Sequence, residues 1–194
     1  MDEFVIFKLL MISFGFSSIV FFLVLLKIVA GYGQHISKKW GPTINDKLGW
    51  ILMEIPTVII FLIYYIIGNR KSALVPIIFL VIWMLHYLQR TFIFPLLIHG
   101  KSPMPLTIII MGIIFNGINT YLQARWLYYF SPPYNTFWIF HPLFIIGILI
   151  FFSGYIINLH SDHIIRNLRK PGETEFKIPY GGMFKYVSSP SYFG

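Results

Sequence analysis

The chain has 194 residues, of which 57% are hydrophobic, 19% aromatic and 11% charged, with a net charge of +8. Soluble domains carry about 25% charged residues, so this deficit, together with long apolar runs, excludes an ordinary soluble domain and places the chain in a bilayer. The absence of cysteine excludes disulfides, thiolate catalysis and cysteine metal ligands. Basic loops of a membrane protein account for the positive charge, and nucleic-acid binding is not expected.

Five apolar segments are long enough to cross the hydrocarbon core as helices: residues 9–29, 48–67, 74–98, 106–130 and 137–159. Helices are expected because every backbone polar group in lipid must be satisfied within the protein. The first segment lacks a small-residue cleavage site and is interpreted as a retained span rather than a signal peptide. The sequence therefore predicts an all-α, polytopic transmembrane helix bundle that forms one membrane-embedded domain over residues 1–194.

Basic residues predict the orientation of these spans. The first loop, the third loop and the tail share one side and hold most of the lysines and arginines. The opposite side holds Arg70 and Lys71, together with an acidic N-terminus that carries Asp2 and Glu3. The positive-inside rule therefore places the tail in the cytoplasm and the N-terminus outside or in a lumen. A bacterial inner membrane and the endoplasmic reticulum are both consistent with this pattern.

Ionisable side chains lie inside the second and third segments, where they are costly unless they face the bundle interior with a partner. Glu54 precedes Pro56 in the second, and Tyr87 and Arg90 share a helical face in the third. One interpretation is structural, with Glu54 paired to a basic side chain, Arg90 reaching the membrane surface and Tyr87 in the interfacial aromatic belt. The other is a buried polar site, in which Tyr87 donates a hydrogen bond and Arg90 neutralises Glu54 or contacts a phosphate.

The fourth segment carries Asn116, Asn119 and Gln123 at helical spacings of three and four residues, so these amides line one face. Hydrogen bonds between helices, worth about 0.6 kcal/mol each in membranes, explain such a face without a ligand. Interhelical hydrogen bonding is therefore preferred over ligand contact for this face.

A polar stripe follows the fifth segment at helical spacings of four, four and three residues: Asn158, Asp162, Arg166 and Arg169. The helix that carries it is predicted to stop near Lys170, because Pro171-Gly172 follows. Arginine forks suit bidentate phosphate contacts, and a carboxylate accepts from a ribose hydroxyl or a carboxamide. A solvated face is the alternative for the arginines. Further along, Tyr180-Gly181-Gly182 predicts a turn in which the backbone approaches another group closely.

The sequence predicts neither a metal site nor a Rossmann fingerprint. His160 and His163 are three residues apart, but a third ligand with suitable spacing and an HExxH motif are both absent. Gly31 and Gly33 lack a third glycine and a strand–turn–helix context.

Several motifs together resemble the steroid 5α-reductase family, the 3-oxo-5α-steroid 4-dehydrogenases. They are GYGQH, WGP, MEIP, HYLQRTFIFPLL, NLHSDHIIRNLRKPGE and KIPYGGMFKYVSSPSYFG, in the family's order along nearly the whole chain. The resemblance implies a membrane enzyme with seven helices that uses NADPH to reduce the 4,5 double bond of a 3-oxo-steroid. Five of these helices are expected here, and the last two family helices are expected to be absent, since the chain stops at Gly194 before an expected Glu.

The resemblance also implies roles for individual residues. Glu54 and Tyr87 match the pair that holds the 3-keto oxygen of the substrate, and Arg90, which shares a face with Tyr87, is expected to contact the substrate as well. Contacts to NADPH are expected from Tyr32, Asn158, Asp162, Arg169, Lys177 and Ser191. Ser191 stands where the family usually has Asn, which weakens a contact on the nicotinamide side.

The expected chemistry is hydride addition to the β-carbon of an enone, with negative charge building on the carbonyl oxygen. Tyr87 donates a hydrogen bond to that oxygen, and Glu54 donates as well if desolvation keeps it protonated. The proton for the α-carbon comes from water. The steroid is expected to enter from the lipid and the cofactor from the cytoplasm, and the enzyme is expected to be a monomer.

Other functions are consistent with the same residues. Related membrane reductases act on enoyl or polyprenol double bonds, and a membrane methyltransferase would bind S-adenosylmethionine on the cytoplasmic side. A non-catalytic membrane protein, such as a truncated partner subunit, predicts no bound nucleotide and no NADPH oxidation with any enone. The nucleotide retained by the purified protein distinguishes a reductase from a methyltransferase.

Overall fold

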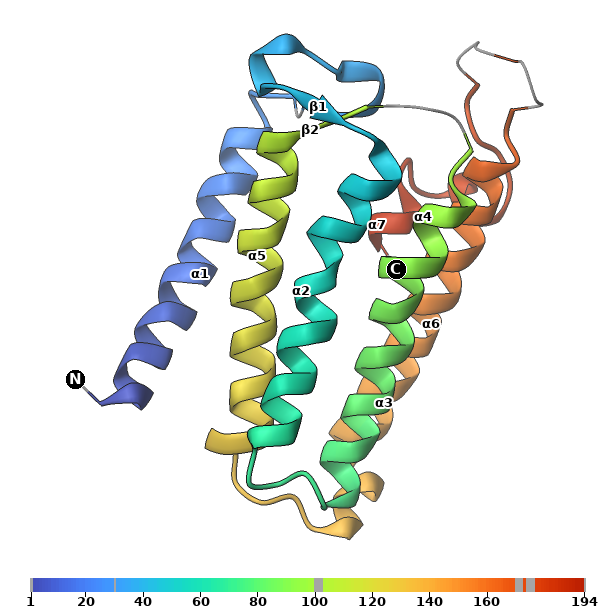
Figure 1. The fold of residues 1–194 in the computed structure, drawn as a ribbon. Helices are drawn as coiled ribbons and strands as arrows, with labels where there is room; N and C mark the ends of the chain where they lie inside the picture. Colours follow the sequence, from blue (N-terminus) through green and yellow to red (C-terminus); the bar gives the residue numbers. More distant parts are fainter. Residues whose placement is uncertain (1, 30, 100–102, 170–172, 174–176, 194) are drawn as a thin grey trace. The chain divides into compact units, whose positions relative to one another are not determined.

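The computed structural model describes the whole chain apart from residues 1, 30, 100–102, 170–172, 174–176 and 194. The long helices of the described residues are α1 (Glu3–Leu25), α2 (Asp46–Ile67), α3 (Leu74–Leu88), α5 (Leu106–Arg125) and α6 (Pro142–Arg166) (Figure 1). Two π-helical segments, η3 (Gln89–Ile93) and η4 (Trp126–Phe130), continue α3 and α5.

Short elements complete the described part of the chain. They are η1 (Gly33–His35), η2 (Lys38–Trp40), α4 (Phe94–Leu97), η5 (Thr136–Phe140), η6 (Gly182–Lys185) and α7 (Pro190–Phe193). Strands β1 (Thr43–Ile44) and β2 (Met104–Pro105) form one antiparallel pair, with Thr43 opposite Pro105. Residues between the predicted spans therefore form short turns, short helices and one antiparallel strand pair that joins two loops distant in the sequence.

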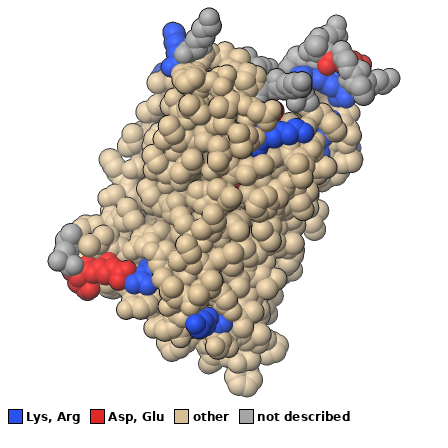
Figure 2. All heavy atoms as spheres, viewed as in Figure 1, with Lys and Arg blue, Asp and Glu red and all other residues tan. Residues whose placement is uncertain are grey.

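Five helices of the described residues are long and apolar enough to cross a membrane: Glu3–Leu25, Asp46–Ile67, Leu74–Leu97, Leu106–Phe130 and Pro142–Arg166. Most of the face drawn in Figure 2 carries no charged side chain. Lipid solvates such surfaces, so the many exposed leucine, isoleucine and phenylalanine side chains on these helices need no protein partner. The predicted all-α bundle with five spans is confirmed, and the protein is a multi-pass membrane protein.

The first span runs from Glu3 to Leu25 rather than over residues 9–29, so both of its predicted ends were wrong. Asp2 caps the helix by accepting from the backbone N–H of Phe4. Arg125 donates to both carboxylate oxygens of Glu3, at 2.8 and 2.6 Å, and this ion pair allows a charged residue inside the helix. Phe7 is buried in an aromatic cluster that ties α1 to the end of α5; this Phe7 cluster consists of Phe4, Phe7, Tyr121, Trp126 and Phe130.

The fifth span is α6; its predicted start was wrong, and the predicted continuation of the helix beyond the apolar segment is present but ends four residues before Lys170. It begins at Pro142 rather than at residue 137, because the proline occupies the first turn and the His141 ring caps the backbone N–H of Leu143. It continues past Leu159 to Arg166 and stops before Lys170. Asn167 ends it there, since its side-chain amide donates to the backbone carbonyl of His163 at 2.9 Å.

The chain divides into two compact units, Met1–Leu96 with Gly100–Tyr134 and Leu97–His99 with Asn135–Gly194. In the first unit, α5 packs against both α1 and α2, and α2 also packs against α3 (Figure 1). Its apolar core is formed by Phe61, Ala124, Leu127 and Tyr128, with Trp83 stacked on Phe61 at 4.4 Å between ring centres.

Small residues let α2 and α5 approach closely inside the first unit. A Cβ at Gly112 would lie 2.0 Å from Cγ of Met53, and one at Gly49 would lie 3.2 Å from Cδ1 of Ile109. Close backbone approach through glycine is a general feature of helix packing in membranes. It brings the turn of α2 that holds Met53 and Glu54 directly against α5.

In the second unit, α6 packs against η6 and α7. Gly181 and Gly182 adopt positive φ angles of 94° and 48°, which glycine accepts without strain. A Cβ at Gly182 would lie 2.6 Å from Cε1 of His160. The predicted turn with a close backbone approach is confirmed, and the group that it approaches is the His160 ring.

Candidate active site

Glu54 lies in the middle of α2 on its buried face and is only 7% exposed. The helix begins at a cap in which Asn45 accepts from the backbone N–H groups of Lys47 and Leu48. The apolar residues of α2 meet lipid or neighbouring helices, so the carboxyl group is carried well inside the bilayer segment. A carboxyl group in that setting requires partners.

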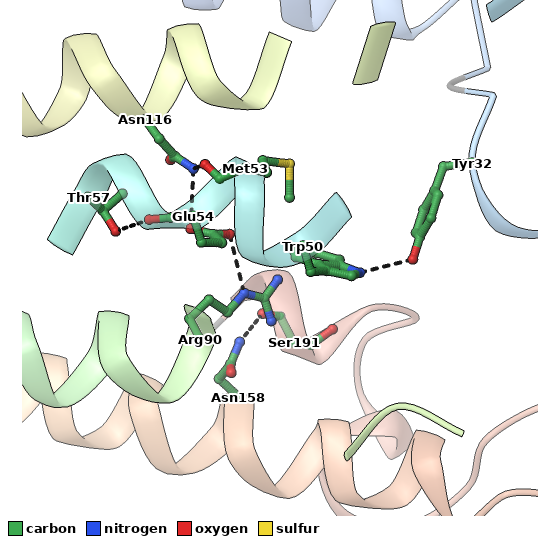
Figure 3. Close-up of polar contacts among 9 residues, drawn as sticks. All are labelled: Tyr32, Trp50, Met53, Glu54, Thr57, Arg90, Asn116, Asn158 and Ser191. Atoms are coloured by element: carbon green, nitrogen blue, oxygen red, sulfur yellow. Dashed lines mark hydrogen bonds and ion pairs between the residues drawn. The ribbon is translucent and has the colours of Figure 1, made fainter. Parts of the chain in front are cut away.

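Both oxygens of the Glu54 carboxyl have a neighbour from another helical segment (Figure 3). Asn116 of α5 donates from Nδ2 to Oε2 at 3.2 Å and to the backbone carbonyl of Met53 at 2.8 Å. Arg90 of η3 places Nε 3.7 Å from Oε1, which is an ion-pair distance rather than a hydrogen bond. Of the three positions that the sequence allowed for Arg90, beside Glu54, at a phosphate or at the membrane surface, the structure places it beside Glu54.

Side chains of α2 and α3 donate to backbone carbonyls at and near Glu54. Thr57 donates from Oγ1 to the carbonyl of Glu54 at 2.5 Å, and Trp83 donates from Nε1 to the carbonyl of Thr57 at 3.1 Å. Pro56 lies between these residues inside the helix and has no N–H to donate. Side chains thus supply donors to a stretch of α2 in which proline weakens the helical hydrogen bonds.

Arg90 stands on a π-helical turn, a feature that inserts an extra residue into a helix and is frequent at functional sites. Its guanidinium carbon lies 4.5 Å from the ring centre of Trp50 and 4.4 Å from that of Phe94. Cation–π contacts with two rings favour the charged head in this apolar setting. Trp50 in turn donates from Nε1 to the Tyr32 hydroxyl at 3.0 Å, so Tyr32 connects to the Glu54 surroundings through one tryptophan (Figure 3).

Tyr87 lies on α3, one turn before Arg90. Its ring packs on Trp83, with 4.5 Å between ring centres, and meets the His86 ring edge-on at 4.9 Å. The hydroxyl interacts electrostatically with Glu54 and Arg90 and with the side chain of Asn119. The first unit therefore brings together the three residues predicted to contact the substrate, Glu54, Tyr87 and Arg90.

Two residues of this cluster were not singled out for it by the sequence. Trp50 lies four residues before Glu54 on the same helix, and that spacing is a signal that could have found it. Asn116 was predicted to form an interhelical hydrogen bond, and it does so with α2, but its acceptor on Glu54 was not predicted.

In the second unit, α6 carries three of the residues proposed to be polar contacts: Asn158, Asp162 and Arg166. Asn158 donates from Nδ2 to the backbone carbonyl of Ser191 at 2.7 Å and so anchors α7 to α6 (Figure 3). Asp162 is 7% exposed. Two predicted cofactor residues, Asn158 and Ser191, are thus brought into direct contact.

The predicted stripe is shorter than expected, because α6 ends at Arg166. Arg169 lies beyond the helix and is exposed, so its placement on one helical face with Asp162 was wrong. Lys177 forms an ion pair with Glu173, four residues earlier. Within the described residues, no group of three His, Asp or Glu side chains is placed to hold a metal ion.

The cluster of Glu54, Tyr87 and Arg90 in the first unit is suited to bind and polarise an oxygen atom. It combines the carboxyl of Glu54, the phenol of Tyr87 and the guanidinium of Arg90 inside membrane-spanning helices. Donors fixed in a site of low dielectric interact strongly with charge that develops on a bound oxygen atom. The cluster is therefore suited to a lipophilic molecule with one carbonyl group.

Comparison with known proteins identifies relatives along the whole chain. Residues 102–194 match the family described as 3-oxo-5-alpha-steroid 4-dehydrogenase. The full chain is similar to 3-oxo-5-alpha-steroid 4-dehydrogenase 1 of Mus musculus, with 39% identity over 197 residues and 76% of that relative covered. The Rattus norvegicus protein of the same description is 38% identical over 201 residues, with 100% of this chain and 75% of that relative covered.

A plant relative extends this similarity. Steroid 5-alpha-reductase DET2 of Arabidopsis thaliana is 36% identical over 181 residues, which cover 88% of this chain and 68% of that relative. Identity at this level over most of both chains confirms the family resemblance predicted from the motifs. The chain belongs to the 3-oxo-5α-steroid 4-dehydrogenase family, the steroid 5α-reductases, which are oxidoreductases.

Proposed function

We propose that the protein reduces the 4,5 double bond of a 3-oxo-steroid with NADPH, and that Glu54 and Tyr87 hold the 3-keto oxygen. The names of relatives from mammals and plants support the reaction class. The observation that carries the assignment of residues is the cluster itself: Glu54, Tyr87 and Arg90 come together inside the first unit, in a segment with few other ionisable groups.

Reduction of an enone builds negative charge on the carbonyl oxygen while a hydride adds to the β-carbon. Tyr87 is a phenol and donates one hydrogen bond to that oxygen, and Glu54 in its neutral form donates a second. Donors already in place stabilise the transition state without reorganisation, and one such donor is worth about 10²–10³ in rate. A proton from water then completes the product at the α-carbon.

Arg90 is proposed to assist Glu54 and Tyr87 through its positive charge. Its charge is held between Trp50 and Phe94 and lies 3.7 Å from Glu54. A cation close to the carbonyl oxygen also favours the developing negative charge. This is the role proposed for Arg90 as a substrate contact, and a phosphate contact is not required of it.

NADPH supplies the hydride when it is bound. The residues proposed to hold it have suitable chemistry: Asn158 and Asp162 for a carboxamide or ribose hydroxyls, and Arg169 and Lys177 for phosphates. Asn158 uses Nδ2 for Ser191, which leaves Oδ1 to accept from a ligand. Tyr32 is the further proposed contact, and its hydroxyl already accepts a hydrogen bond from Trp50.

The orientation of the chain is part of the proposal. The tail, which carries half of the proposed NADPH contacts, faces the cytoplasm, where the cofactor is found. Positive charge in the first loop, third loop and tail supports this orientation. The steroid enters from the lipid, because the proposed catalytic side chains lie within membrane-spanning helices.

Product analysis with the purified full chain tests the proposal. Testosterone and NADPH are supplied to the protein in detergent, and the products are identified by mass spectrometry against a 5α-reduced standard. The account predicts the saturated 3-ketone and equimolar loss of NADPH, with no reaction of a saturated 3-ketone. Retained S-adenosylmethionine would favour a methyltransferase instead, and inertness toward steroid, polyprenol and enoyl substrates would favour a non-catalytic protein.

A further inference from the structure

Asn116 lies at the crossing of α5 and α2 and is only 8% exposed. Its Nδ2 donates to two acceptors on consecutive residues of α2, the backbone carbonyl of Met53 at 2.8 Å and Oε2 of Glu54 at 3.2 Å (Figure 3). A backbone carbonyl can only accept, so the nitrogen of the amide must face α2. The backbone carbonyl of Met53 therefore determines the orientation of the Asn116 side chain.

This orientation makes the two oxygens of Glu54 different. Oε2 accepts from Asn116, whereas Oε1 has Arg90 at 3.7 Å, beyond hydrogen-bond distance. In a neutral carboxyl group one oxygen is a pure acceptor and the other carries the proton. An N–H group pairs more strongly with the carbonyl oxygen of a neutral carboxyl group than with its hydroxyl oxygen, so the bond from Asn116 to Oε2 favours a proton on Oε1 of a neutral Glu54.

The packing of α2 and α5 makes the arrangement rigid. Gly112, one turn before Asn116, brings α5 onto Met53, where a Cβ would overlap the methionine side chain. Asn116 is thus fixed at both ends, by its own backbone and by the carbonyl of Met53. A carboxyl group that is hydrogen-bonded to a rigid donor cannot rotate to exchange its two oxygens without breaking that bond.

We infer that Asn116 is a positioning residue for the reaction: it holds Oε2 of Glu54 and thereby presents Oε1, with its proton, to the carbonyl oxygen of the substrate. The inference rests on the function proposed above. It goes further by assigning the two oxygens different roles and by giving a part in the reaction to a residue that does not touch the substrate. Without Asn116 the carboxyl samples both orientations, and a fraction of the enzyme presents the wrong oxygen.

The test compares Asn116→Leu with Thr120→Val in the full chain. Leucine keeps most of the volume of asparagine and removes both hydrogen bonds. Thr120 lies one turn further along the buried face of α5, and its hydroxyl has no hydrogen-bond partner among the described residues, so valine is a matched control. If Asn116→Leu does not fold, Asn116→Ser replaces it, because a serine hydroxyl is too short to reach both acceptors.

Steady-state kinetics with testosterone and NADPH provide the first readout. Asn116→Leu is expected to lower kcat about 3- to 10-fold, the range of one lost hydrogen bond, and to leave the KM for NADPH unchanged. The pH dependence of kcat should also differ from that of the wild type, which a purely structural role would not cause. Thr120→Val should match the wild type in all three quantities. An unchanged kcat in Asn116→Leu, or an equal loss in both variants, would overturn the inference.

Infrared spectroscopy provides a second readout that needs no turnover. The C=O stretch of a neutral Glu54 is identified as the band that is lost in Glu54→Gln. A donor to the carbonyl oxygen lowers this frequency, so Asn116→Leu should shift the band to higher wavenumber and Thr120→Val should not. A band that does not move would contradict the hydrogen bond to Oε2. Failure of the wild type to reduce testosterone, with the expected infrared shift present, would instead contradict the proposed function and leave the Asn116–Glu54 contact supported.

Discussion

The guanidinium group of Arg90 is stacked against Trp50, with 4.5 Å between the guanidinium carbon and the ring centre. The two residues come from η3 and α2. Phe94 meets the same guanidinium carbon at 4.4 Å, and its ring stands edge-on to that of Trp50 at 5.1 Å. The cation that lies beside Glu54 is therefore held by aromatic rings on neighbouring segments.

Replacement of Trp50 tests whether this stacking supports catalysis. Cation–π contacts contribute about 0.5–2 kcal/mol, so Trp50→Leu is expected to lower kcat roughly 2- to 30-fold. Trp50→Phe keeps a ring for Arg90 but loses the N–H that donates to Tyr32, and it should lose less activity. Trp126→Leu, in the Phe7 cluster, is the control and should leave kcat unchanged. Equal activity of Trp50→Leu and Trp50→Phe would show that the ring has no part in holding Arg90.

Tyr87→Phe removes only the phenol oxygen proposed to bind the 3-keto group. Loss of one oxyanion donor predicts about a 10²–10³-fold lower kcat with testosterone. The affinity for NADPH should stay the same, since no cofactor contact is proposed for Tyr87. Steady-state kinetics measure the first quantity, and fluorescence titration of NADPH measures the second.

Tyr128→Phe is the matched control for that change. Tyr128 is fully buried, and its hydroxyl donates to the backbone carbonyl of Pro76 at 3.2 Å. Its removal should lower the free energy of unfolding by about 0.5–1.5 kcal/mol while kcat at low temperature is retained. A Tyr87→Phe variant that behaves like Tyr128→Phe, destabilised but active, would remove Tyr87 from the mechanism.

The Phe7 cluster predicts where α1 is held. Phe7 is 3% exposed, whereas Phe16 on the same helix is 68% exposed. Phe7→Ala should therefore lower the Tm of the purified protein in detergent, and Phe16→Ala should leave it within error. The loss should be smaller than the about 3–5 kcal/mol seen for such changes in soluble cores, because lipid solvates apolar side chains in both states. Equal Tm values for the two variants would contradict the cluster.

The proposed orientation is testable because the chain has no cysteine of its own. Ser72 lies between α2 and α3 and Ser188 lies in the tail, and both are exposed. In intact cells or sealed vesicles of native orientation, Ser72→Cys should react with a membrane-impermeant maleimide. Ser188→Cys should react only after permeabilisation. The reverse pattern of labelling would place the tail on the outer side.

Length and hydropathy were sufficient to predict the five spans, because the requirement for apolar, helical segments acts along each segment separately. The helix ends were less predictable. Asp2 caps the start of α1, where Glu3 pairs with Arg125, which is 122 residues away, and an amide cap at Asn167 ends α6. Tertiary contacts and local side-chain hydrogen bonds decide where such helices begin and end, and a hydropathy profile carries no information about either.

In the candidate site, too, some features could be predicted from the sequence and others could not. Costly ionisable groups within spans pointed to Glu54, Tyr87 and Arg90, since such residues need partners in lipid. The partner on α5 was not predictable in detail, because Asn116 is 62 residues from Glu54 and the rotation of α5 against α2 is set by packing at Gly112. The stacking of Arg90 on Trp50 depends on the π-helical turn at Gln89–Ile93, for which the sequence offered no signal.

The rate of hydride transfer in Glu54 variants tests the central claim most directly. NADPH labelled with deuterium on the transferred position is mixed with wild-type protein and testosterone, and deuterium at the β-carbon of the product is followed by mass spectrometry in a single turnover. The account predicts labelled 5α-product from the wild type, a rate about 10²–10³-fold lower for Glu54→Leu, and an intermediate rate for Glu54→Gln, which keeps a neutral donor. A folded Glu54→Leu variant that transfers deuterium at the wild-type rate would contradict it.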